Sequence, residues 1–175
     1  MLLIETRPQE TTEEPFKSYF EAFKSAGLSV PLPLQLMSGG GPLFNALTGF
    51  LNCYVDHPVL SRPLCAAIRF HTASRSNFPA CIEFNKSLLE KLGMVDDLAS
   101  LKNEHPTASA LSPEEQRILT FVADALWRPR SIDKARIDSF KNDGVTGEIL
   151  LQAVVHGALL LMSGPVVAAF SSRGD

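Results

Sequence analysis

The chain has 175 residues, of which 45% are hydrophobic and 20% charged, and its formal net charge is −3. A chain of this size can bury the core of one domain without metals or disulfide bridges. The acidic balance argues against nucleic acid or an anionic membrane as a partner. Three cysteines argue against an extracellular disulfide framework, and Glu5 interrupts the apolar N-terminus too early for a secretory signal, so we expect a cytoplasmic protein.

Residues 1–35 are expected to form an arm and a first helix. Glu13–Pro15 predicts the helix start because acidic side chains favour the positive end of the helix dipole, and Gly27 is expected to end it. Four aromatic residues then recur at helical spacing: Phe16, Tyr19, Phe20 and Phe23. Such a stripe indicates packing in the core or against another subunit, with a ligand pocket as the alternative.

Two breaks and two helices follow. The prolines of Val30–Leu34 predict a linker, and Gly39–Pro42 predicts a loop without the Lys-Ser/Thr pair of a phosphate-binding loop. Residues 43–54 form an amphipathic pattern in which Cys53 is expected to be buried. Ser61 is expected to cap the next helix.

The run Ser76–Asn85 predicts a tight turn that restarts as a helix. Asn77 is a suitable N-cap, and Cys81 falls in the first turn, where the helix dipole favours a thiolate. The alternative is that Cys81 is a small buried hydrophobe. Gly93 is expected to end this helix, and residues 94–101 to form a short one.

The C-terminal third contains three predicted helix starts. Ser112–Glu115 forms a capping box, Ser131 opens a further helix, and Thr146 caps the last long one. Residues 149–172 carry no charge and could span a bilayer, but Gly164–Pro165 predicts a break. We therefore expect a helix buried in the core or in a subunit interface, and no membrane partner.

Only thiol chemistry has candidate residues. The four histidines lack metal-binding spacing and no Cys-x-x-Cys is present, so we expect no metal and no cofactor. Asn85 lies one turn after Cys81 and can bind a substrate, but it cannot shuttle a proton. Glu83 is two residues after Cys81 and therefore lies on another side of the helix, where it could serve as a surface acid near the site.

The preceding helix carries Arg69, His71 and Arg75. Either arginine would lower the pKa of Cys81 if it lay close, and the alternative is that both are solvated. We expect His71 to share a helix face with Cys65. His156 lies on an apolar face, which is typical of a core histidine.

No stretch alternates as a strand would, and the order of helix signals resembles a known family. The resemblance is to the AhpD-like, carboxymuconolactone decarboxylase superfamily, over about residues 40–170, and most of all to its uncharacterised peroxidase-related group. It is carried by Asn77-x-x-x-Cys81, the helix end at Gly93, Leu111–Glu115, Asp143–Thr146 and the final helix with His156. It implies an all-α bundle of seven to eight helices, a single domain over 1–175, and a homodimer, trimer or hexamer.

The sequence departs from the peroxidase motif. Those members carry Cys-x-x-Cys, a histidine four residues later, and an upstream glutamate. Cys81 matches the peroxide-attacking cysteine, but Phe78 replaces the resolving cysteine and Asn85 replaces the histidine. The glutamate position falls at Ala66 or Cys65. If Cys65 occupies it, the resemblance implies that Cys65 lies close enough to Cys81 to form a disulfide.

Three functions follow. The first is a peroxidase-related thiol enzyme acting on a small substrate such as a peroxide. The second is a non-redox enzyme or binding protein for small acids, in which Arg69 or Arg75 holds the carboxylate. The third is an inactive oligomer. We expect the first, with catalytic candidates Cys81, Cys65, Asn85 and Glu83 and substrate-binding candidates Arg75, Phe78, Arg69 and His71.

Overall fold

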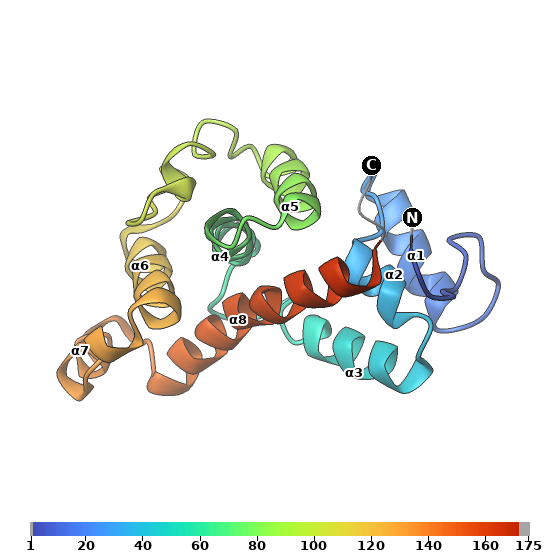
Figure 1. The fold of residues 1–175 in the computed structure, drawn as a ribbon. Coiled ribbons are helices and arrows are strands. Elements are labelled where there is room, and N and C mark those ends of the chain that lie inside the picture. Colours follow the sequence, from blue (N-terminus) through green and yellow to red (C-terminus); the bar gives the residue numbers. More distant parts are fainter. Residues whose placement is uncertain (1, 172–175) are drawn as a thin grey trace.

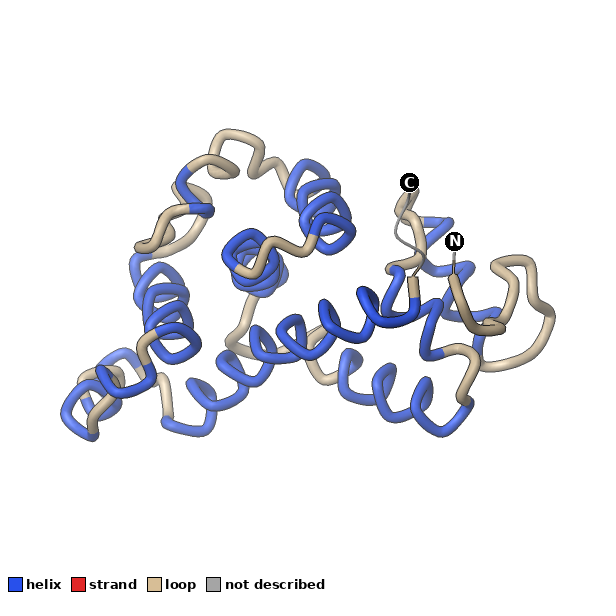
Figure 2. The backbone as a smooth tube through the Cα atoms, viewed as in Figure 1, coloured by secondary structure: helices blue, strands red, loops and turns tan. Residues whose placement is uncertain are grey.

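The computed structural model describes residues 2–171, and in this range it contains eight α-helices, three 3₁₀ helices and no strand beyond one isolated bridge (Figures 1 and 2). The all-α prediction is confirmed. The α-helices are α1 (Phe16–Ser25), α2 (Leu32–Met37), α3 (Gly41–Asn52), α4 (Arg62–Arg75), α5 (Pro79–Lys91), α6 (Pro113–Trp127), α7 (Lys134–Asp138) and α8 (Gly147–Phe170). The 3₁₀ helices are Ser100–Lys102, Pro129–Ser131 and Lys141–Asp143.

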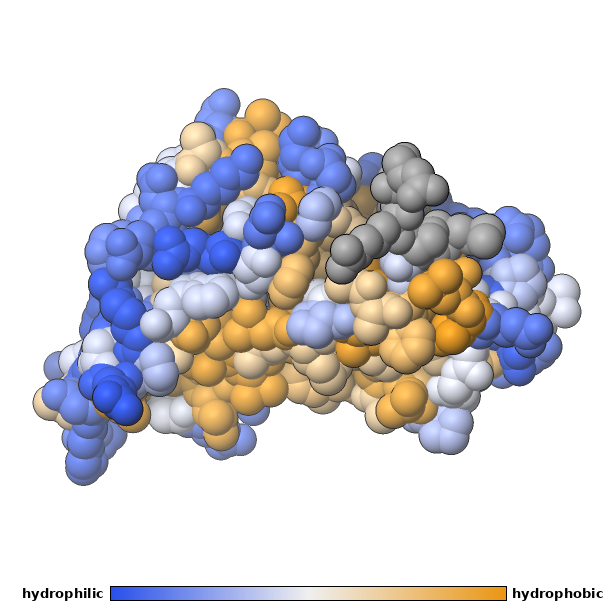
Figure 3. Space-filling model, in the orientation of Figure 1, coloured by the Kyte–Doolittle hydropathy of each residue, from blue (hydrophilic) through white to orange (hydrophobic). Residues whose placement is uncertain are grey.

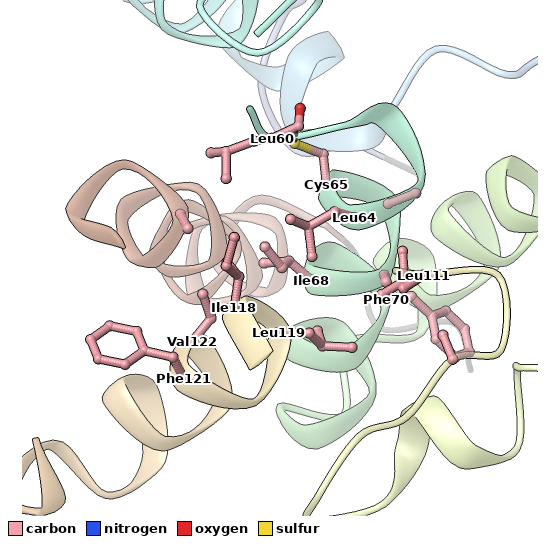
Figure 4. Packing of buried hydrophobic residues seen from close by; sticks show 14 of the residues in the cluster. Leu60, Leu64, Cys65, Ile68, Phe70, Leu111, Ile118, Leu119, Phe121 and Val122 are labelled. Atoms are coloured by element: carbon pink, nitrogen blue, oxygen red, sulfur yellow. Dashed lines mark hydrogen bonds between the residues drawn. The ribbon is translucent and has the colours of Figure 1, made fainter. Parts of the chain in front are cut away.

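Helix α4 is the centre of the main core. It packs against α5, α6 and α8, which surround it in Figure 1. Figure 4 shows Leu64 and Ile68 of α4 directed toward Ile118 and Leu119 of α6. These side chains are almost wholly buried, so this contact contributes much of the hydrophobic stabilisation.

Three helix starts are capped as the sequence predicts. The hydroxyl oxygen of Ser61 accepts a hydrogen bond from the Leu64 N–H, and that of Thr146 accepts one from the Ile149 N–H. Ser112 and Glu115 form the full capping box. Caps of this kind depend on neighbouring residues alone, which is why a local pattern identifies them.

Helices α1, α2 and α3 form a second, smaller core beside the C-terminal half of α8 (Figure 1). Phe16 and Phe20 of α1 pack on Phe44 of α3, with ring centroids 4.6 and 6.3 Å apart. The expectation that the aromatic stripe packs in a core is therefore met by these two members. The other two, Tyr19 and Phe23, are only partly buried.

Four local predictions are wrong. Residues 32–37 are helical rather than linker, because Pro33 lies in the first turn, where its missing N–H costs little. Cys53 is exposed, because it follows the end of α3. Residues 94–101 are mostly turns. Asp133 caps helix α7, whereas Ser131, the predicted start, belongs to the 3₁₀ helix before it.

The predicted break at Gly164–Pro165 is also wrong, because α8 continues through both residues to Phe170. The proline removes one backbone donor without ending the helix. Gly164 has a packing role instead, since the ring of Phe78 lies where a side chain at this position would begin. The glycine therefore allows the start of α5 to approach α8 closely.

The outer side of α8 carries exposed apolar residues, and Figure 3 shows the apolar surface along this helix. They are Leu151, Val155, Met162 and Phe170. By length and composition alone α8 could cross a membrane, but its inner side packs on α4 and α6 in the fold, as in a core helix. The expected self-association through this helix remains a prediction.

Candidate functional site

A cavity of about 530 Å³ lies between the two cores. Its walls come from α1, α2 and α3 on one side and from α4, α5 and α8 on the other, and most of the lining side chains are apolar. Two pairs at i, i+4 spacing face it, namely Cys65 with Arg69 on α4 and Cys81 with Asn85 on α5. His156 of α8 completes this polar corner.

Arg69 is held by two neutral groups. Its Nε donates a hydrogen bond to Asn85 Oδ1 at 3.1 Å, and its Nη1 lies 3.4 Å from His156 Nε2. The Asn85 amide is fixed in turn, because its Nδ2 donates to the Cys81 carbonyl at 2.8 Å. Burial lowers the pKa of Arg69, but a guanidinium is not deprotonated in proteins, so Arg69 remains charged.

No carboxylate compensates this charge. Among residues 2–171 the cavity lining includes no Asp or Glu side chain. The other lining arginine, Arg62, is exposed at the surface and pairs with Asp56 at 3.0 Å. Arg69 itself is half-buried in the cavity wall, because it lies one helix turn after Cys65, so the alternative that both arginines are solvated holds for Arg75 but not fully for Arg69.

His156 is neutral at physiological pH. Burial and then the Arg69 cation lower its pKa from 6.5 to about 3. A neutral ring can accept from Arg69 at Nε2, which places the proton on Nδ1. The Cys65 carbonyl partly offsets the pKa shift, although it does not meet the geometry of a hydrogen bond with Nδ1. Tyr54 packs on the ring at 4.2 Å between centroids.

The surroundings of Cys81 oppose the expected thiolate. Burial raises the pKa of the Cys81 thiol, and no cation opposes the shift. The helix dipole is a weak effect beside desolvation, and the local geometry also differs from the prediction. Phe78 is the N-cap residue and makes no side-chain cap, while Asn77 has a φ of 53° in the preceding turn.

Cys65 is a second buried thiol in the same cavity. Its Sγ donates to the Leu60 carbonyl at 3.7 Å, and burial raises its pKa to about 11 despite the nearby Arg69. Cys65 and Cys81 are both free thiols in this structure. The disulfide between them remains a prediction.

The other candidates lie away from the cavity. His71 points to the opposite side of α4, where its Nδ1 donates to the Leu101 carbonyl at 2.9 Å. Arg75 is exposed, with its guanidinium 5.6 Å from the Trp127 ring centroid. Glu83 is exposed on α5, and Phe78 packs on α8. His71 therefore does not share the cavity face of Cys65, since its offset of six residues turns it away.

Sequence reasoning placed His156 among core residues and missed its contact with Arg69. These residues are 87 positions apart, and no local pattern joins them. It also treated Tyr19 and Phe23 as packing residues first, whereas both line the cavity, where the Phe23 ring meets Phe84 at 6.0 Å. The described residues contain no cluster of metal-ligating side chains.

Comparison with known proteins identifies the fold. No family model and no curated protein matches the sequence. Among solved structures, the chain is similar to a peroxidase-related protein with an alkylhydroperoxidase AhpD core from Ralstonia eutropha JMP134, with a TM-score of 0.74 and 15% identity. It is also similar to a peroxidase-related protein from Silicibacter sp. TM1040, with a TM-score of 0.73 and 16% identity. Each match covers 99% of this chain and 92% of the other. The chain therefore has the AhpD-like helical fold.

Proposed function

We propose that this protein binds a small organic acid in the cavity and that Arg69 holds the acid's carboxylate. The observation that carries the proposal is the uncompensated guanidinium of Arg69 in an otherwise mostly apolar pocket. Arg69 is half-buried, and an unpaired charge partly removed from water is costly to a fold, so it is retained where a partner offsets the cost. A bound carboxylate is the simplest partner of this kind.

The surroundings of Arg69 suit this role. Asn85 and His156 fix the guanidinium through Nε and Nη1 without neutralising it. The remaining N–H groups are free to donate to an anion, and two parallel donors match a carboxylate well. Because the arginine is positioned in advance, the acid does not have to order it on binding.

Thiol redox chemistry is the second candidate function. It is favoured by one observation, which is that Cys81 lies in the first turn of α5 and faces the same cavity. Peroxide attack would oxidise the Cys81 thiol to a sulfenic acid and release the corresponding alcohol or water. The raised pKa of Cys81 and the absence of a proton shuttle at Asn85 make this candidate weaker.

The first function is tested by titration calorimetry with a set of carboxylic acids. We expect Arg69→Gln to weaken binding by about 100-fold, because a buried charged hydrogen bond is lost. Arg75→Gln is the matched control, since it changes an exposed arginine on the same helix and should leave the affinity unchanged. Equal affinities in wild type and Arg69→Gln would contradict the proposal.

The second function is tested by treating the protein with hydrogen peroxide and mapping the cysteines by mass spectrometry. We expect exposed Cys53 to be oxidised before Cys81, because oxidation follows access and thiolate character. Cys53→Ser and Cys81→Ser serve as matched variants. A sulfenic acid confined to Cys81, with peroxide consumption lost only in Cys81→Ser, would favour the redox function.

A further inference from the structure

The charges around the cavity set a limit on the charge of its ligand. Arg69 provides one positive charge within the pocket. His156 accepts from Arg69 through Nε2 and is therefore unprotonated in this arrangement. Arg62 lies where the cavity lining meets the surface, and its guanidinium forms an ion pair with Asp56. The pocket as a whole therefore offers one uncompensated positive charge.

The remaining walls offer little to a second charge. On the side of α1, α2 and α3 the lining consists mainly of residues such as Ala22, Phe23, Leu32 and Leu47. The polar groups there are neutral: the Tyr19 hydroxyl donates to the Thr48 carbonyl, and Asn52 is an exposed amide. A second carboxylate in this region would lose its water and gain no cationic partner, so its burial there is unfavourable.

The volume indicates that the apolar part of the ligand is substantial. The cavity of about 530 Å³ falls within the range of roughly 300–1,000 Å³ that is usual for small-molecule sites. A carboxylate at Arg69 fills only one corner of it. The rest is complementary to an aliphatic or aromatic body, which would gain from burial against the aromatic pair Phe23 and Phe84.

From this arrangement we infer that the ligand is a monocarboxylate with a large apolar body, rather than a dicarboxylate or a small polar acid. The inference rests on the proposed function, because it takes the binding of an acid at Arg69 as given. It adds that the ligand carries a single negative charge and that the rest of the ligand is apolar. The acid group lies against α4, α5 and α8, and the apolar body extends toward α1, α2 and α3.

The test compares octanoate, octanedioate, octanamide and acetate on the wild-type protein by calorimetry. We expect octanoate to bind at least about tenfold more tightly than each of the other three. Octanedioate adds a second charge, octanamide removes the only charge, and acetate removes the apolar body. Comparing ligands on one protein avoids any dependence on whether a variant folds.

The outcomes separate the inference from the proposal beneath it. If octanedioate or acetate binds as tightly as octanoate and Arg69→Gln weakens that binding, the inference fails while acid binding at Arg69 stands. If octanamide equals octanoate, or if no acid binds, both fail. Thermal unfolding of Arg69→Gln without ligand, beside Arg75→Gln, shows that any loss of binding comes from a folded protein.

Discussion

Helix α4 presents one side to α6 and another to the cavity, and the two sides differ in composition. Toward α6 it places Leu64 and Ile68, both wholly buried against apolar neighbours. Toward the cavity it places Cys65 and Arg69, and Arg69 contacts polar groups of α5 and α8. The difference teaches that one helix can stabilise the fold with one face and carry a charge on another, because packing on the second face is incomplete. We call these the sealed side and the cavity side of α4.

The largest expected effect on stability comes from a substitution on the sealed side. Ile68→Ala should lower the free energy of unfolding by about 3 kcal/mol, because it removes buried methyl groups and leaves a void. Leu159→Ala, which changes a half-buried residue of the cavity wall, should cost less than about 1 kcal/mol. Urea denaturation of both variants checks this difference. Equal losses would mean that the cavity side is packed as tightly as the sealed side.

The next effect concerns a histidine on each side, His156 at the cavity and His71 on the sealed side. The pKa of His156 falls to about 3 in the folded protein, so below 6.5 the unfolded chain takes up a proton that the folded chain refuses. The free energy of unfolding should therefore decrease as the pH falls through this window, by about 2 kcal/mol at about pH 5. His156→Gln should lose this part of the pH dependence.

Burial also lowers the pKa of His71, so the wild type carries a contribution of the same sign from the sealed side. Denaturation of wild type, His156→Gln and His71→Gln at neutral pH and at about pH 5 separates the contributions. An unchanged pH slope in His156→Gln would show that this ring is protonated without cost.

A smaller effect tests the contact of α8 with the sealed side. A Cβ at Gly157 would lie 2.9 Å from Leu126 Cδ1 and 3.2 Å from Ile68 Cγ2. Gly157→Ala should therefore cost about 1–2 kcal/mol, because neighbouring side chains must move and the gain in helix propensity offsets only part of the strain. Thermal unfolding measures it. A stabilised variant would show that α8 has room to shift.

The smallest effect on stability belongs to Arg69 itself. Arg69→Met should change the free energy of unfolding by less than about 1 kcal/mol, because the lost hydrogen bonds to Asn85 and His156 are offset by removal of an unpaired charge. Acid binding should be lost in the same variant. Chemical denaturation in the absence of acids provides the measurement, and a loss above about 3 kcal/mol would identify Arg69 as a structural residue.

Much of the fold could be predicted because its signals are local. The caps at Ser61, Ser112 and Thr146 depend on residues within one turn, and the apolar periodicity of the helices needs no tertiary information. The continuation of α8 past Pro165 could not be predicted in this way. It depends on the approach of Phe78 from another helix, which gives Gly164 a different role from the one its sequence context indicates.

The candidate site was predictable only within single helices. Spacing alone relates Cys81 to Asn85, and the same i, i+4 rule relates Cys65 to Arg69. The state of Cys81 could not be predicted, because desolvation by the surrounding chain outweighs the helix dipole. The contact of Arg69 with His156 requires α8 to cross α4, which is a property of the whole fold.

The Phe78 ring on Gly164 makes these two positions energetically dependent on each other. Phe78→Cys would create a Cys-x-x-Cys spacing with Cys81, but it would also uncover the bare backbone of α8. Gly164→Ala alone would collide with the ring, whereas the same change in a Phe78→Cys background would avoid this collision. The costs of the two substitutions should therefore not add, and the combined change should be less harmful than their sum. Position 78 can therefore be changed at least cost together with position 164.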